Sequence, residues 1–157
     1  FVDQMSELEG LPKGALEAAA QLAADKGQEG QWAFTLDYPS YIPVMTYAES
    51  RDLRKTLFMA FNTKCAKGDA LDNQEIVRQL VTLKQQRAKL LGYESHAHFT
   101  LEERMAKSPE TVFEFLNSLL EKAKPKAALD VQEVAALAKK LDQLEVLEKW
   151  DFAYYSE

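Results

Sequence analysis

The chain has 157 residues, of which 46% are hydrophobic and 28% charged, a size and composition typical of about one globular domain. Its 19 Lys and Arg against 25 Asp and Glu give a formal net charge of −6, which argues against nucleic-acid binding because that affinity comes largely from neutralised phosphates. No stretch approaches the roughly 20 apolar residues of a membrane span, and a single cysteine, Cys65, excludes an internal disulfide.

The N-terminal part predicts one helix and one extended segment. Pro12 stands near the first helical position, where its missing N–H costs nothing, and the alanine-rich run 15–24 has high helix propensity. Gly27 is a plausible stop for this helix. Residues 31–36 are short, rich in aromatic and β-favouring types and bounded by turn residues, so they predict a short extended segment.

Two closely spaced prolines, Pro39 and Pro43, then predict no long regular element before a short helical turn over residues 44–48. Ser50 is a good N-cap for a helix over residues 51–61. Leucines, an alanine and a phenylalanine fall on one face of that helix at spacings of three and four, which indicates a face that packs on a core.

The middle of the chain predicts two further helices. Residues 72–75 combine a side-chain acceptor with Glu three positions later, a capping signature, and Gly92 closes the helix that follows. Ser95 is the N-cap of a shorter helix that we expect to run through Met105.

The third part predicts one long helix. Ser108, Pro109 and Glu110 provide a cap, a proline and an acid at a helix start, and apolar residues recur at helical spacing over about 109–141. Pro125 lies inside this pattern and predicts a kink. Asp151 is expected to cap a final helical turn. The fold class predicted is therefore mainly α: a multi-helix fragment with one short extended segment (31–36) and a long Pro-kinked helix.

Candidate metal ligands are few. The two histidines, His96 and His98, lie two positions apart on a predicted helix, where side chains point about 200° apart and do not share a metal ion. We expect two surface or half-buried imidazoles. The zinc-peptidase motif His-Glu-x-x-His is absent from the sequence.

Nucleophile and acid–base arrangements are equally sparse. There is no Gly-x-Ser-x-Gly elbow and no Gly-rich phosphate loop. Cys65 lies in a predicted helical context and is interpreted as a packed thiol rather than a nucleophile. Glu102 and Glu103 are expected on a solvated helix face. The sequence therefore predicts no catalytic, cofactor-binding or metal-binding residue.

Aromatic residues gather in two places, around the two prolines and at the end of the chain. Tyrosines lining a groove can bind extended peptides, but aromatics at helix ends more often fill the base of a core, and we favour the second interpretation. The residues concerned are Tyr38, Tyr41, Tyr47, Trp150, Phe152, Tyr154 and Tyr155.

A series of short motifs runs through the whole chain. They are Thr35-Leu36-Asp37-Tyr38-Pro39-Ser40-Tyr41 with Pro43, Tyr47-Ala48, Arg51-Asp52-Leu53-Arg54, Leu90-Leu91-Gly92-Tyr93, Met105-Ala106-Lys107-Ser108-Pro109 with Val112 and Phe115-Leu116, and Trp150-Asp151 with Tyr154-Tyr155-Ser156-Glu157. In their order and spacing they resemble the thimet oligopeptidase family of zinc metallopeptidases, which includes oligopeptidase A and the bacterial peptidyl-dipeptidases (dipeptidyl carboxypeptidases). Tyr-Pro-Ser-Tyr-x-Pro and Trp-Asp-x-x-Tyr-Tyr are the strongest pieces.

This resemblance implies a largely helical, two-lobed peptidase with a deep channel that admits short peptides. Zinc in the parent enzyme would be held by the two histidines of His-Glu-x-x-His and a downstream Glu, with the motif's Glu activating a water. The matching region lies upstream of that motif. Residues 1–157 are therefore expected to be a single helical fragment that binds no zinc and is inactive alone, an expectation that also fits the cut-looking ends of the chain.

The resemblance also sets the expected partners and location. The expected partners are short peptide substrates of the parent and the remainder of the parent chain, with no nucleic acid and no membrane. The expected location is the cytoplasm, or alternatively the periplasm. The segment from Tyr38 to Tyr47 approaching the channel is a hypothesis, and exposed apolar patches are expected on the isolated piece. Whether the parent cuts internally or removes dipeptides stays open. The alternative function is a stand-alone helical protein-interaction module.

Overall fold

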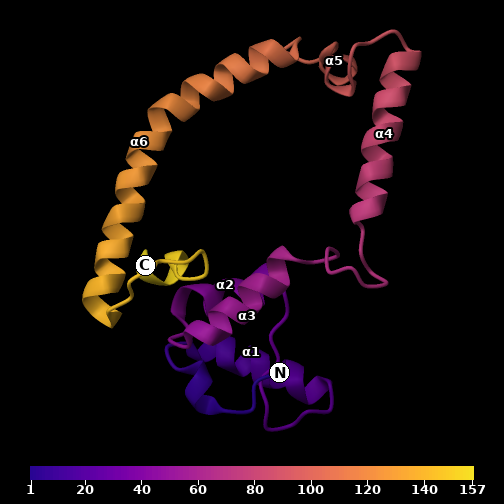
Figure 1. Ribbon diagram of the computed structural model, residues 1–157. Helices are drawn as coiled ribbons and strands as arrows, with labels where there is room; N and C mark the ends of the chain where they lie inside the picture. Colours follow the sequence, from indigo (N-terminus) through magenta and orange to yellow (C-terminus); the bar gives the residue numbers. More distant parts are fainter. The chain divides into compact units, whose positions relative to one another are not determined.

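The computed structural model describes all 157 residues, and its regular elements are helices (Figure 1). They are the 3-10 helix η1 (Met5–Leu8) and the α-helices α1 (Lys13–Asp25), α2 (Tyr38–Tyr47), α3 (Arg51–Asn62), α4 (Gln74–Leu90), α5 (His96–Leu101), α6 (Pro109–Asp142) and α7 (Phe152–Tyr155). The predicted mainly-α class is confirmed. No helix has both the length and the apolar character needed to span a membrane.

The chain forms two compact units. The first contains residues 1–64 and 132–157, and the second contains residues 65–131. The helix α6 contributes to both, since it runs without a break from Pro109 to Asp142. Pro125 lies inside it, so the prediction of one long helix rather than two is confirmed.

The segment 31–36 is extended, but it does not form a strand of a sheet. Its only bridge joins Trp32 to Val2 in antiparallel fashion, with hydrogen bonds of 2.8 and 2.9 Å between the two backbones. No other strand lies beside it to continue a ladder. Trp32 and Phe34 instead pack their side chains against the core of the first unit.

The helix α2 corrects the expectation that the two prolines prevent a regular element before residue 44. Pro39 falls in the first turn, and Pro43 lies inside the helix, where it removes one backbone hydrogen bond. The helix persists because one of its faces is buried, and that packing outweighs the lost bond. The buried residues of α2 are Tyr41, Val44 and Met45.

The core of the first unit lies where α2 meets α1, α3 and α7. The aromatic rings at its edge are in direct contact: Tyr41 stacks on Phe61 with centroids 4.5 Å apart, and Phe58 meets Trp150 edge-on at 6.0 Å. The buried residues of this core are Val2, Leu8, Leu11, Tyr41, Val44, Met45, Ala48, Leu53 and Leu57.

Local signals place most helix ends correctly. The hydroxyl of Ser50 accepts from the backbone N–H of Leu53 at 3.3 Å at the start of α3, and the hydroxyl of Ser95 accepts from the N–H of His98 at 3.4 Å at the start of α5. After α4, Gly92 has φ of 86°, a left-handed conformation in which glycine is unstrained. These three positions confirm the prediction.

Two ends differ from the prediction. The helix α4 begins at Gln74, with Asn73 in the cap position, while the carboxylate of Asp72 accepts from the N–H of Gln74 at 2.8 Å. The helix α5 ends at Leu101 and not at Met105. A turn over residues 102–106, with Lys107 at φ of 62°, breaks the pattern that predicted a longer helix.

In the second unit, α4 packs on α5. The guanidinium of Arg87 lies over the ring of Phe99 at 5.0 Å, and Tyr93 meets Phe99 edge-on at 5.3 Å. Ala88 is the buried residue of α4, and the large apolar residues of this helix remain exposed. The expectation of exposed apolar surface is therefore confirmed.

Candidate functional site

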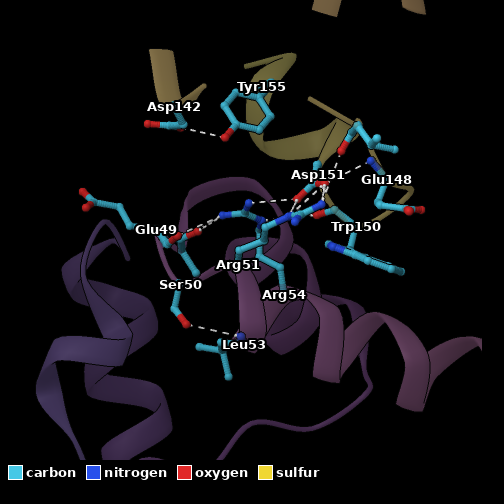
Figure 2. Close-up of polar contacts among 12 residues, drawn as sticks. Glu49, Ser50, Arg51, Leu53, Arg54, Asp142, Glu148, Trp150, Asp151 and Tyr155 are labelled. Carbon is cyan, nitrogen blue, oxygen red and sulfur yellow. Dashed lines mark hydrogen bonds and ion pairs between the residues drawn. The ribbon is translucent and has the colours of Figure 1, made fainter. Parts of the chain in front are cut away.

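A buried cluster of charged side chains in the first unit is the strongest candidate for a functional site. Figure 2 shows Arg51 and Arg54, which project from α3, converging on Asp151, which precedes α7. Arg54 and Asp151 are the buried charged residues of the chain, with exposed fractions of 1% and 0%. Burying a charge is unfavourable unless it is paired, so the contacts of these two residues are decisive.

The carboxylate of Asp151 is fully occupied. Its Oδ1 accepts from Arg51 Nε at 2.9 Å and from Arg54 Nη2 at 3.1 Å. Its Oδ2 accepts from Arg51 Nη2 at 2.7 Å and from the backbone N–H of Glu148 at 3.0 Å. Arg51 therefore binds the carboxylate with two parallel N–H groups, the geometry that makes arginine–carboxylate pairs specific.

The guanidinium of Arg54 also finds hydrogen-bond acceptors within the fold. Its Nη1 donates to the carbonyl oxygens of Ala48 at 2.7 Å and Glu49 at 3.2 Å, and its Nε donates to that of Trp150 at 3.3 Å. The ring of Tyr154 lies 4.1 Å from its Cζ, a cation–π contact that helps to hold a desolvated cation. One side chain thus ties the end of α2 to the segment that precedes α7.

Arg51 forms the outer edge of the cluster, because its side chain is 42% exposed. Its Nη2 also donates to the carbonyl oxygen of Val146 at 3.4 Å, and its Cζ lies 5.9 Å from the centre of the Trp150 ring. Water screens this part of the cluster, so Arg51 contributes less to stability than Arg54 does.

The charge state of the cluster follows from these contacts. Burial alone would raise the pKa of Asp151, but hydrogen bonds from Arg51, the Glu148 N–H and Arg54 outweigh it and leave that pKa below its ordinary value. The same hydrogen bond to Asp151 raises the pKa of Arg51. Both residues are therefore charged at neutral pH.

A second polar pair fixes α7 from its other side. The hydroxyl of Tyr155 donates to Asp142 Oδ2 at 2.6 Å, which connects α7 to the last residue of α6. Burial and this hydrogen bond together raise the pKa of the Tyr155 phenol to about 12. The phenol is therefore a stable hydrogen-bond donor rather than an acid that exchanges protons near neutral pH.

This arrangement can hold a segment in place, because its charged atoms are bonded to one another and to the backbone. The oxygens of Asp151 are committed to donors within the fold, and its lowered pKa makes it a poor general base. Arg54 is 1% exposed, and its Nε, Nη1 and Nη2 atoms all donate hydrogen bonds within the fold. The cluster is a structural clamp, defined here as Arg51, Arg54 and Asp151, that fastens the segment leading into α7 onto α2 and α3.

The sequence places Asp151 correctly at the start of a helical turn, but the predicted role is wrong. Asp151 occupies the N-cap position of α7 without making a side-chain capping bond, because its carboxylate turns towards the arginines of α3. A signal for this pairing exists in the sequence. Arg54 lies on the same helical face as Leu57 and Phe61, and a charge within an apolar face indicates a buried partner.

The other residues considered for catalysis are scattered. Cys65 is exposed and lies beyond the end of α3 with φ of 54°, so the packed-thiol interpretation is wrong. Glu102 and Glu103 are exposed as expected, but they follow the end of α5 instead of lying on a helix. Glu102 accepts a hydrogen bond from the hydroxyl of Tyr93.

His96 and His98 lie on α5 and are half-buried, as predicted. His98 Nδ1 lies 2.8 Å from Ser95 Oγ, and its Nε2 lies 3.7 Å from Glu94 and 3.8 Å from Glu110. The ring of His96 lies beside that of Phe99, with centroids 6.3 Å apart. No three His, Cys, Asp or Glu side chains in the chain are arranged to hold a metal ion.

The aromatic residues divide between core and surface. Tyr41 and Tyr155 are buried, in agreement with the favoured interpretation. Tyr38 is 67% exposed, and its ring is tilted against that of Phe61, with centroids 5.9 Å apart. Tyr47 and Tyr154 line an open groove together with two leucines of α6.

The model of peptidase family M3 matches residues 44–157, which include α3 and the whole clamp. The chain is 38% identical over 161 residues to oligopeptidase A of Haemophilus influenzae, with 100% of this chain and 24% of that protein covered. It is 37% identical over 165 residues to the probable cytosolic oligopeptidase A of Arabidopsis thaliana, with 100% of this chain and 23% of that protein covered. With the dipeptidyl carboxypeptidase of Escherichia coli it shares 29% identity over 156 residues, with 99% of this chain and 23% of that protein covered.

The chain therefore spans about a quarter of the length of these relatives. The family match covers well over half of the chain, and the similarity to the relatives extends over its whole length. On this evidence the chain belongs to peptidase family M3.

Proposed function

We propose that this chain is part of a zinc-dependent M3 peptidase that hydrolyses peptide bonds in short peptides, and that it supplies scaffold rather than catalytic groups. The observation that carries the proposal is the 38% identity to oligopeptidase A along the entire chain. In the parent, residues 1–157 would be one helical fragment of a two-lobed enzyme with a channel between the lobes.

The residues of this chain do not fit a zinc site. M3 peptidases are zinc-dependent in general, but the two histidines lie on a six-residue helix with one ring bonded to Ser95 and the other beside Phe99. His-Glu-x-x-His is absent from the sequence. We therefore assign zinc to another part of the parent and assign no catalytic, cofactor-binding or metal residue here.

The clamp gives this scaffold a definite task. It anchors the segment containing Trp150 and Asp151, part of the Trp-Asp-x-x-Tyr-Tyr motif, onto α3 through charged hydrogen bonds. In the parent, the clamp would fix the direction in which the polypeptide leaves α7 and so the placement of whatever follows. Its members are positioning residues, since they touch only groups within the fold.

The expected surroundings of the parent follow from its relatives. Short peptides are the substrates and the remainder of the parent chain is the partner, with no nucleic acid or membrane. A cytoplasmic location is favoured because one relative is named as cytosolic, while another is named as organellar. The alternative of a stand-alone interaction module is not favoured, because the whole chain matches a continuous quarter of known peptidases.

A chimaeric enzyme tests the proposal directly. The 161-residue matching segment of Haemophilus influenzae oligopeptidase A is replaced by this chain, and fluorogenic short peptides of both the internally cleaved and the dipeptide-releasing kind are assayed. The chimaera is expected to hydrolyse peptides in a manner that a chelator suppresses. The 157-residue chain alone is expected to hydrolyse none.

Two results would contradict the proposal. The first is a chimaera that folds, as judged by circular dichroism and a cooperative thermal transition, yet hydrolyses neither class of peptide. The second is turnover by the purified 157-residue chain that disappears on addition of chelator, because that would place the catalytic zinc site in this segment.

A further inference from the structure

One surface of the second unit is not explained by the clamp or by the proposed scaffold role. Five large aliphatic residues of α4 recur at spacings of one, three and four, so they share one broad face of the helix. They are between 50% and 63% exposed. This α4 face consists of Ile76, Val77, Leu80, Val81 and Leu83.

The neighbours of α4 leave this face open. The helix packs on α5, and that contact buries Ala88 near its C-terminal end. Polar contacts to the α5 region come from Gln85, whose side chain bonds to Glu94 and His96. The aliphatic residues nearer the start of α4 lie outside this contact. An uninterrupted aliphatic face of this kind is uncommon on a monomeric protein and usually marks an interface.

The face also carries a charge. Lys84 lies one turn after Leu80 on the same side of α4, is exposed, and makes no ion pair or hydrogen bond. The four basic residues of α4 outnumber its single acidic one, and Arg78 is the one paired with Glu75, at 3.2 Å. A complementary surface would therefore be apolar with an acidic residue placed opposite Lys84.

We propose that the α4 face is the docking site for an amphipathic, acidic helix from the remainder of the M3 polypeptide. This inference rests on the proposed function, since it assumes that the chain is part of a longer peptidase. About three-quarters of the length of the relatives lies outside the matched region, and α4 falls within the residues that the family model matches. Polypeptide to cover the face is thus available in the parent. The covering helix would present apolar side chains to Leu80 and an acidic side chain to Lys84.

The test compares one substitution in two settings. Leu80→Asp places a charge at the centre of the face, and Gln86→Asp places the same charge at an exposed position beside the face, about 120° around the same helix from Leu80. Both variants are made in the 157-residue chain and in the chimaera with Haemophilus influenzae oligopeptidase A. Thermal unfolding is followed by circular dichroism, and the oligomeric state of the isolated chain by sedimentation velocity.

In the isolated chain, Leu80→Asp and Gln86→Asp are expected to shift the unfolding midpoint equally, because neither site is covered. In the chimaera, Leu80→Asp is expected to lower the midpoint by roughly 5 °C or more relative to Gln86→Asp, since it buries a charge in an apolar contact. The milder Leu80→Ala is expected to give a smaller shift in the same direction, which provides a reading if Leu80→Asp prevents the chimaera from folding.

Two results would overturn the proposal. Equal shifts for Leu80→Asp and Gln86→Asp in a folded chimaera would mean that the face stays in water. A dimer of the isolated chain that Leu80→Asp dissociates would mean that a second copy covers the face. A chimaera that folds with the expected shift but does not hydrolyse peptides would refute the proposed function alone.

Discussion

Replacing Asp151 by asparagine is the most direct test of the clamp. The side chains have nearly the same shape, so the substitution removes the charge without leaving a cavity. Asp151 is completely buried, and its loss would leave Arg54, itself 1% exposed, as a buried cation without a counter-ion. Removing one partner of a buried pair destabilises a fold by about 3–5 kcal/mol, and we expect a loss in free energy of unfolding within this range.

The measurement is urea-induced unfolding followed by tryptophan fluorescence. Trp32 and Trp150 are the two tryptophans of the chain, and both belong to the first unit, so their fluorescence reports on the unit that contains the clamp. Asp52→Asn is the matched control. Asp52 is an exposed acid in the first turn of α3, where its charge contributes only about 0.3–1 kcal/mol.

Equal losses in the free energy of unfolding for Asp151→Asn and Asp52→Asn would contradict this prediction. That result would mean that Arg54 finds other partners or water when Asp151 loses its charge. Salt provides a second check, because buried ion pairs are only weakly screened. If a high salt concentration destabilised the wild type as much as Asp151→Asn does, the pair would not be buried from solvent.

Further predictions concern pH, α7 and α3. The pKa of Asp151 lies below its ordinary value of about 3.9, so the carboxylate stabilises the fold above that pH, and this stabilisation is lost as the pH falls below it. Between pH 2 and 6, the free energy of urea unfolding should therefore fall more steeply with decreasing pH for wild type than for Asp151→Asn. Tyr155→Phe removes the hydrogen bond to Asp142 and should cost about 1.5 kcal/mol at pH 7. Since the Tyr155 pKa is raised to about 12, the free energy of unfolding of the wild type should also fall between pH 10 and 12. The same fall in a Tyr155→Phe variant would show that Tyr155 is not its cause. Ser50→Ala should cost about 1 kcal/mol through loss of the N-cap of α3, whereas Ser50→Gly should cost only a few tenths; equal losses in both, measured by urea unfolding, would argue against capping.

Signals that depend on a few neighbouring residues were sufficient for much of the fold. The hydroxyls of Ser50 and Ser95 cap the helices that they precede, and α6 starts at Pro109 and continues through Pro125. These features follow from backbone hydrogen bonding and helix propensity within one or two turns. The order of the short motifs was likewise enough to indicate the peptidase family.

Features that depend on distant parts of the chain were predicted less well. Asp151 reads as a helix cap from its neighbours alone, because the arginines that claim its carboxylate lie 97 and 100 positions earlier. The two prolines of α2 argue against a helix locally, but the burial of Tyr41 and Val44 against the core outweighs the one backbone bond that Pro43 removes.

Local sequence was enough to establish the helical class, most helix starts and the family, since each is encoded in side chains that act within a few residues or in motifs that can be read in order. The folded chain was needed to show that Asp151 joins Arg51 and Arg54 in a buried clamp and that the α4 face is left uncovered. One cause explains both features. Burial is a property of what packs around a residue, and the free energy of a charge or an aliphatic side chain depends on that surrounding more than on its neighbours along the chain.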